Sequence, residues 1–379
     1  MSNKINIIFF GRLTKEKGVD IVLETLQKYQ NNDKINFWIF GKGDKYFEDK
    51  IKEVDRARAG VKYLGWQNQR TIKKYLGKSH YCLMPSRFLE TFGLSALESI
   101  SQGVPVIGFA KGGLKQFIPK NLDINRQKGQ NDFEKLDKII KQIIDSHNNE
   151  EYQKISNQLK EKSKEYSKKH WIKNFEQIAG RNKRILVVSD FIENIGGIEN
   201  YILETDKLLS QSGHKVDKFG LDSKLVKYRK FLMPLVGFNI FGYLGLRRKI
   251  KQFQPDIIWI HSASRYLGWL PLINCNGKTC LMMYHDFGYF HPFPSKVYEQ
   301  NQIEFELNFI DFIKAGQTKN PFKIAFIILK FFSIKLLKNT IKKNTHLHLV
   351  PSEYMENVVS KSRNIDKKNI KTLAHFNFS

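Results

Sequence analysis

Cysteines and long apolar runs are scarce in this chain, and each shortage excludes a class of protein. Three cysteines among 379 residues are too few for the disulfide framework of a small secreted domain, so we expect reduced thiols. No segment reaches the ~20 consecutive apolar residues that a membrane-spanning helix needs. Strand-like residues begin at Ile5, which argues against an amino-terminal signal peptide. We therefore expect a cytoplasmic protein.

Acidic residues are also few, because 37 Asp and Glu stand against 63 Lys and Arg, for a formal net charge of +26. Such a charge attracts polyanions, so nucleic acid and anionic membrane both have to be considered. The sequence has no helix-turn-helix, zinc-finger or base-stacking pattern, and its lysines are spread along the whole chain. We therefore expect no nucleic-acid partner and consider an anionic membrane surface the better candidate.

Two stretches fit contact with a membrane surface. Residues 231–246 are uncharged and run into Arg247-Arg248-Lys249, and residues 322–338 are apolar with lysines at 323, 330, 335 and 338. This lysine spacing keeps most of the charges near one face of a helix, which suits a helix lying on anionic lipid. A buried core helix with lysines reaching past its edge explains the same pattern. If the first interpretation holds, the protein is peripheral on the inner face of the membrane.

The length and the pattern of strands predict two α/β domains. With 41% hydrophobic residues, the chain can form two separate cores. Strands alternate with helices in both halves, which predicts parallel sheets covered by helices on both faces.

The most informative segment runs from Arg87 to Ile107. A short buried strand, residues 81–84, ends at Pro85, and helical spacing then runs from Ser95 to Gln102. A helix that starts after a strand presents free backbone N–H groups, which form an anion site. Glu90 and Glu98 flank this helix start, about 80° out of register on an ideal helix, so they cannot share one proton. Each acid therefore binds a different group, and hydroxyls on either side of a phosphate fit.

This segment resembles the E-x7-E signature of retaining glycosyltransferases of family 4, which have the GT-B fold of two Rossmann-like domains facing across a cleft. The spacing of E-x-F-G-L, the second Glu and G-x-P-V-I is kept throughout. The resemblance implies that Glu98 holds the ribose of a nucleotide-sugar donor and that Glu90 contacts the donor sugar. It places Phe92, Gly93, Leu94 and Ser95 at the donor, with Leu94 and Ser95 offering backbone and hydroxyl donors to the diphosphate.

A second motif lies upstream, in Gly11-Arg12-Leu-Thr-Lys-Glu-Lys17-Gly18, between a strand and a helix. A guanidinium and an ammonium five residues apart can grip one diphosphate from two directions. The segment is similar to the G-R-L-x-x-x-K-G of the family, which implies that Arg12 and Lys17 are phosphate ligands. With no Asp-x-Asp pair in the chain to hold a divalent ion, we expect these charges to act without a metal or other cofactor.

Three weaker signals fit the same donor site. Gly41 and Gly43 form a turn after an apolar strand, and the loop ending in Trp66 resembles the family's loop over the nucleobase. Gly112 and Gly113 open a loop that usually carries Glu where this chain has Gln116, which leaves the role of that loop open.

The strand pattern restarts at Lys183 and resembles the family's acceptor-side domain. The residues that carry this resemblance are the paired glycines Gly196 and Gly197 with Glu199, the strand ending at His261, and the strand that delivers His285 and Asp286. The resemblance implies that the glycines let the backbone approach the phosphates and the acceptor. His285 would touch the donor sugar or its developing positive charge.

The order of the two domains is the reverse of the family's usual order. We expect a donor domain over residues 1–182 and an acceptor-side domain over 183–379, whereas in the family the nucleotide domain normally comes second. The chain is then either a circular permutant, joined through residues 179–183, or a fusion of two halves, such as a piece of a longer tandem enzyme. Permutation is geometrically reasonable because exposed termini tolerate rejoining, and we favour it.

The resemblance implies a transferase that retains anomeric configuration and moves a sugar to a glycan or lipid-linked acceptor, in cell-envelope polysaccharide or glycolipid synthesis. In the family's front-face route the departing phosphate oxygen takes the acceptor's proton, so no separate base is required. Two alternatives stay open. Mismatched halves would bind a nucleotide sugar without transferring it, and an epimerase of the same fold would need no acceptor.

Overall fold

The computed structural model describes residues 4–57, 60–193, 196–222, 239–290, 309–315, 320–363 and 365–378. It divides into two compact units, residues 1–170 with 375–379, and residues 171–374. Each unit is built around one parallel sheet, as the sequence predicted. The first apolar stretch that we considered for membrane contact lies, up to residue 238, outside the described residues.

The first unit contains a five-stranded parallel sheet in the order β3-β2-β1-β4-β5. Its strands are β1 (Ile5–Phe10), β2 (Ile35–Phe40), β3 (Val61–Gly65), β4 (Tyr81–Met84) and β5 (Val106–Gly108). The strands read as nearly continuous apolar runs because helices cover both faces of the sheet. The order reverses between β1 and β4, so the carboxyl ends of these two strands open a crevice in which α/β proteins bind ligands.

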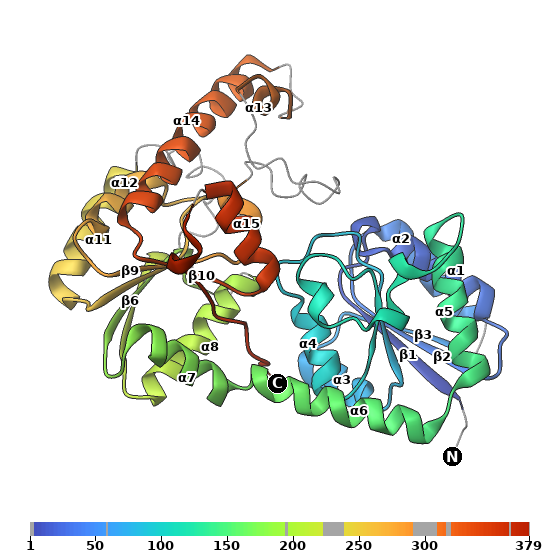
Figure 1. Ribbon diagram of the computed structural model, residues 1–379. Coiled ribbons are helices and arrows are strands. Elements are labelled where there is room, and N and C mark those ends of the chain that lie inside the picture. Colours follow the sequence, from blue (N-terminus) through green and yellow to red (C-terminus); the bar gives the residue numbers. More distant parts are fainter. Residues whose placement is uncertain are drawn as a thin grey trace. The chain divides into compact units, whose positions relative to one another are not determined.

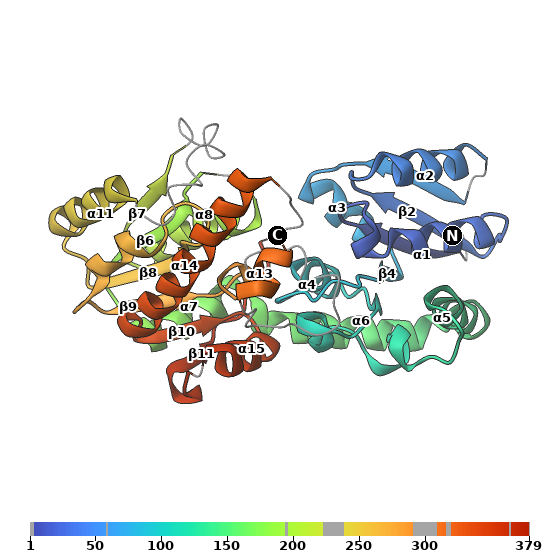
Figure 2. The ribbon, with the colours of Figure 1, turned by 90° about the horizontal axis from the view of Figure 1, so that it is seen from above.

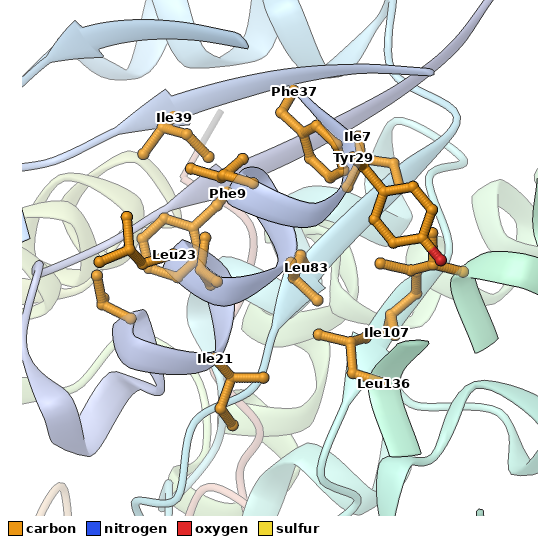
Figure 3. Packing of buried hydrophobic residues seen from close by; sticks show 14 of the residues in the cluster. Ile7, Phe9, Ile21, Leu23, Tyr29, Phe37, Ile39, Leu83, Ile107 and Leu136 are labelled. Atoms are coloured by element: carbon orange, nitrogen blue, oxygen red, sulfur yellow. The ribbon is translucent and has the colours of Figure 1, made fainter. Parts of the chain in front are cut away.

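Helices α1, α2 and α5 lie on one face of this sheet and α3 and α4 on the other (Figure 1). The helices of the first unit are α1 (Val19–Tyr29), α2 (Lys45–Ala57), α3 (Gln69–Leu76), α4 (Leu94–Ser101), α5 (Asp132–Ser146) and α6 (Asn149–Ser163). Alternate residues of β1 and β2, such as Ile7 and Phe37, pack against Leu23 of α1 and Leu136 of α5 (Figure 3). This core is largely apolar and includes residues of β1 and β4, the two strands that the predicted site residues follow.

The second unit contains a six-stranded parallel sheet in the order β11-β10-β9-β8-β6-β7, which can be followed strand by strand in Figure 2. Its strands are β6 (Arg184–Phe191), β7 (Lys215–Leu221), β8 (Ile257–Ser262), β9 (Cys280–Met283), β10 (Leu347–Val350) and β11 (Ile370–Thr372). Its helices are α7 (Lys168–Ala179), α8 (Gly197–Gln211), α11 (Ile240–Phe253), α12 (Trp269–Leu272), α13 (Phe309–Ala315), α14 (Pro321–Asn344) and α15 (Glu353–Arg363). Here the order reverses between β6 and β8, so this sheet has a switch point of its own.

The chain passes between the two units twice. After the first unit, α7 packs on the second sheet, where the ring of Trp171 stacks on Phe175 and its indole N–H donates to the Tyr201 hydroxyl. Near the end of the chain, residues 375–378 return to the first unit, where His375 packs edge-on against Phe92 and the Asn377 N–H donates to the Tyr166 carbonyl. Most of α7, which directly follows the first unit in sequence, thus belongs to the second unit, and residues 375–378, which follow the second unit, belong to the first.

Candidate functional site

The predicted phosphate ligands and the first predicted acid lie at the switch point of the first sheet. Residues 11–18 follow β1, residues 85–93 follow β4, and both loops therefore leave from the carboxyl ends of neighbouring strands. Gly18 brings the loops together, because its φ is 72° and a Cβ added to it would lie 2.0 Å from the Pro85 carbonyl oxygen, which leaves no room for a side chain. The Arg87 N–H also donates to the Glu16 carbonyl at 2.9 Å.

Lys17 and Glu90 form an ion pair across these two loops, and each side chain is 22% exposed. The Lys17 ammonium also lies 4.9 Å from the centre of the Phe88 ring. The sequence predicted two separate donor contacts, whereas the structure joins them. A bound diphosphate would therefore meet a lysine whose charge is already partly compensated, and Glu90 can accept a sugar hydroxyl only beside or instead of Lys17.

Arg12 is exposed in the same loop. The pKa of nearby Glu16 is lowered, chiefly by a hydrogen bond with Thr14, and the charge of Arg12 contributes to the shift. The loop after β1 thus carries both predicted phosphate ligands, the guanidinium of Arg12 and the ammonium of Lys17.

Helix α4 starts between the two predicted acids. Gly93 caps it with φ 99°, and among the described residues no side chain caps this start and no acid lies in the first turn. The first backbone N–H groups of α4, next to Leu94 and Ser95, therefore retain the partial positive charge that binds anions. Phe92 itself is buried and packs edge-on against Phe117, so its ring anchors the helix start.

Glu98 lies one turn inside α4 and is half-buried, with Gln69 Nε2 at 3.3 Å from its Oε1. Burial raises the pKa of Glu98 to about 7, because the ionised carboxylate loses solvation there. At neutral pH this carboxyl group is only partly ionised. Hydrogen bonds donated by the hydroxyl groups of a ligand would favour its ionised form.

The predicted glycine turn lies beside the loop after β1. Gly41 has φ 142°, and the Leu13 N–H donates to the Lys42 carbonyl while the Asp44 N–H donates to the Leu13 carbonyl. The N–H of Gly43 donates to the Glu48 carboxylate at 2.9 Å. Trp66, directly after β3, is 67% exposed, so its ring is accessible for stacking.

Gln116 has a structural role that its amide explains. Its Nε2 donates to the Gly113 carbonyl at 2.9 Å and to the Phe92 carbonyl at 3.4 Å, and the Tyr166 hydroxyl lies 3.4 Å from its Oε1. The family's usual Glu could not donate to these carbonyls. In this chain the loop is thus tied to the residue that precedes Gly93.

In the second unit, the predicted His285 lies two residues beyond β9 and is paired with another histidine. His285 Nε2 lies 2.8 Å from Nδ1 of His261, which lies near the end of β8, and the rings stack with centres 5.0 Å apart. His285 is 8% exposed and His261 is 1% exposed. Tyr201 packs edge-on against His285.

The other predicted residues of this unit also follow the carboxyl ends of its strands. Asp286 pairs with Arg265 at 3.1 Å and accepts from the Gly288 N–H at 2.8 Å. Gly196 and Gly197 open α8 after β6, and Glu199 is buried in its first turn, where desolvation raises its pKa.

Two residues with contacts in these sites were part of the sequence motifs but were given no role there. Arg87 joins the loops after β1 and β4 through its guanidinium, and His261 contacts His285 directly. The position of Arg87 directly after Pro85-Ser86 and that of His261 at a strand end were the available signals.

Elsewhere in the first unit, a cavity of about 460 Å³ is lined by Tyr81, His147 and Tyr152 among others. Tyr81 begins β4, so this cavity lies at the amino ends of the strands and away from the predicted site. Within the described ranges, no group of three or more His, Cys, Asp or Glu side chains could hold a metal ion. No helix in the same ranges is long and apolar enough to cross a membrane.

Comparison with protein families identifies both halves of the chain. Residues 2–170 match the family model described as "Glycosyl transferases group 1", and residues 195–375 match the one described as "Glycosyltransferase Family 4". Each half of the chain is therefore similar to a glycosyltransferase domain, and each has a parallel α/β sheet, consistent with the GT-B fold.

Curated relatives match only part of the chain. An uncharacterized 41.2 kDa protein in the cps region of Klebsiella pneumoniae is 34% identical, over 38% of this chain and 37% of that protein. A glycogen synthase of Hydrogenovibrio crunogenus is 34% identical, over 32% of this chain and 24% of that protein. A granule-bound starch synthase of Ipomoea batatas is 33% identical, over 28% of this chain and 17% of that protein. The chain thus spans well under half the length of each of these relatives.

The solved structures named here each match less than half of this chain. The pneumococcal O-GlcNAc transferase GtfA, crystallised with UDP and GlcNAc, has 22% identity and a TM-score of 0.36, covering 42% of this chain and 32% of that chain. Anabaena HepE, crystallised with UDP and glucose, has 19% identity and a TM-score of 0.34, covering 42% of this chain and 43% of that chain.

Proposed function

We propose that the protein is a retaining glycosyltransferase that moves a sugar from a nucleotide-sugar donor to a glycan or lipid-linked acceptor, in cell-envelope polysaccharide or glycolipid synthesis. The observation that carries this proposal is the ion pair between Lys17 and Glu90, with Glu90 three residues before Gly93 at the start of α4, which no described side chain caps. A cation, an acid and free N–H groups in this arrangement suit a diphosphate and the sugar attached to it.

In this proposal the donor diphosphate binds to Arg12, Lys17 and the first N–H groups of α4, and no metal or other cofactor is needed. The bond between the anomeric carbon and the phosphate oxygen breaks, and these groups stabilise the negative charge that develops on the leaving diphosphate. The acceptor hydroxyl oxygen bonds to the anomeric carbon on the same face, and its proton passes to the departing phosphate oxygen. Glu98 holds the ribose, Trp66 covers the base, and Glu90 contacts the sugar.

We further propose that the halves are a permuted single enzyme in which transfer requires both units, with His285, Gly196 and Gly197 serving the acceptor side. The support comes from the sequence, in which each motif of a two-domain transferase appears once, including the Arg12–Lys17 motif, the Glu90–Glu98 segment and the strand that delivers His285. The test uses Glu90→Ala and His285→Ala, which should each abolish transfer while nucleotide affinity stays nearly intact. If transfer requires Glu90 and His285 in the same molecule, mixing the two variants restores no activity. Recovery on mixing would show that the site forms between two chains.

A binding module without transfer is the second candidate, and the burial of His285 against His261 favours it. A binding module would bind a nucleoside diphosphate but show no turnover with any acceptor. An epimerase would convert the donor sugar with no acceptor present. Product analysis with labelled nucleotide sugars, with and without a glycan acceptor, distinguishes transfer, binding without turnover and epimerisation.

We also propose that the protein contacts anionic membrane through α14. Leu329, Phe332 and Leu336 are 59%, 53% and 42% exposed along one side of this helix. Ile327 and Ile334 are buried on another side. Lys330 is half-buried, and desolvation lowers its pKa, so the lysine row predicted from the sequence is partly turned inward. The contact proposed for lipid is therefore the apolar stripe, with exposed basic residues such as Lys335 beside it.

A further inference from the structure

The two loops of the donor site are held together by one guanidinium that the proposed chemistry does not use. Arg87 Nη1 lies 2.8 and 2.9 Å from the two carboxylate oxygens of Asp20, in the first turn of α1. The same Nη1 donates to the Lys15 carbonyl at 3.2 Å, and Nε donates to Asp132, in the first turn of α5, at 3.2 Å. The guanidinium of Arg87, in the loop after β4, therefore binds both the segment that follows β1 and the start of α5.

These contacts surround the turn that carries Lys17. Residues 15–17 form a single 3-10 turn with no buried residue, so apolar packing holds it only weakly. The Arg87 side chain bonds the Lys15 carbonyl and its backbone N–H bonds the Glu16 carbonyl, at 3.2 and 2.9 Å. Glu90, three residues after Arg87, then reaches Lys17.

We propose that Arg87 is a positioning residue that keeps the Lys17 turn and the Glu90 loop in register, so that Lys17 meets the donor diphosphate. This inference rests on the proposed donor site and adds a residue to it. Only a planar fork bonds two carboxylates and a carbonyl in fixed directions. A lysine at this position could keep the charge but not the three-way geometry.

A matched control exists between the same two helices. Lys28, in the last turn of α1, pairs with Asp137 of α5 at 2.6 Å, at the end of α1 away from the donor loops. Asp137 keeps Tyr29 and Lys141 as partners when Lys28 is replaced, so Lys28→Gln removes one α1–α5 ion pair without touching the site.

The experiment titrates the full chain with UDP, GDP and ADP and with the matching nucleosides. Arg87→Lys should weaken diphosphate binding about tenfold, or about 1.4 kcal/mol, while nucleoside affinity, which depends on Glu98, stays near the wild-type value. Asp20→Asn should also weaken diphosphate binding and leave nucleoside binding unchanged. Lys28→Gln should change neither affinity. In a Lys17→Ala background, Arg87→Lys should cause little further loss, because Arg87 acts through Lys17.

Equal losses for nucleoside and nucleoside diphosphate would show that Arg87 only stabilises the domain, and would overturn the inference. Additive losses in the double variant, or full diphosphate affinity in Arg87→Lys, would overturn it as well. If the wild type bound none of the diphosphates, the proposed donor site itself would fail. Should Arg87→Lys unfold, as circular dichroism would show, Asp20→Asn provides the same comparison.

Discussion

His261 Nδ1 lies 2.8 Å from His285 Nε2, and the two rings stack with an interplanar angle of 16°. In a neutral pair, one ring donates its proton to the other, so the two histidines have the same tautomer: both carry the proton on Nδ1 if His261 donates, and both on Nε2 if His285 donates. This bond therefore couples the position of the proton on His285 to that on His261. The role of His285 thus depends on a neighbour from the adjacent strand.

This pair predicts the effect of replacing His261. His261→Phe keeps an aromatic ring of similar size but removes the hydrogen bond to His285. Transfer should fall, through kcat rather than nucleotide affinity, because the His285 ring loses the partner that orients it. Steady-state kinetics and nucleoside diphosphate titration of the same variant measure the two effects. Unchanged kcat would show that the His261 contact is only part of the core.

The raised pKa of Glu98 predicts pH-dependent donor binding. The ribose hydroxyls donate hydrogen bonds, which favour the ionised carboxylate, so binding should tighten as pH rises through about 7. Glu98→Gln should weaken binding and remove the Glu98 component of this pH dependence, whereas the titration of the diphosphate itself should persist in both proteins. Calorimetry at several pH values measures the difference, and parallel profiles for wild type and variant would contradict the assignment.

Glu98 also affects stability with the opposite pH dependence. Its folded-state pKa is raised from the usual value of 4.5 to about 7. The stability it contributes is therefore fully present below pH 4.5 and is lost as the pH rises towards 7. Thermal melts of the ligand-free protein should show Glu98→Gln gaining stability relative to wild type as the pH rises from about 5 to about 7. A constant difference over this range would contradict the prediction.

The stripe on α14 predicts binding to acidic lipid. Vesicles containing an acidic phospholipid should sediment the protein at low salt and release most of it as added salt screens the charges. Phe332→Ser should reduce this binding. Tyr46→Ser, which removes an exposed aromatic ring from the first unit, should not. Equal binding to neutral vesicles would show that charge plays no part.

Much of the fold and part of the site follow from sequence patterns that are local. Gly11-Arg12 and the Glu90–Glu98 segment predicted two strand-to-helix turns, and parallel strands bring such turns to one edge of a sheet. The Lys17–Glu90 ion pair could not be predicted in the same way, because it depends on the rotamers of two flexible side chains 73 residues apart. The inward side of α14 depends on the elements that pack against it, which a helical repeat does not identify.

The most direct measurement for the donor-site proposal is a calorimetric titration of wild type and Lys17→Ala with UDP, GDP and ADP. We expect the wild type to bind at least one of them. Lys17→Ala should lose about 1.5–3 kcal/mol of binding free energy, the usual range for a hydrogen bond to a charged group. Nucleoside binding should change little, since Lys17 is assigned to the phosphates alone. No diphosphate binding by the wild type, or undiminished binding by Lys17→Ala, would contradict the account.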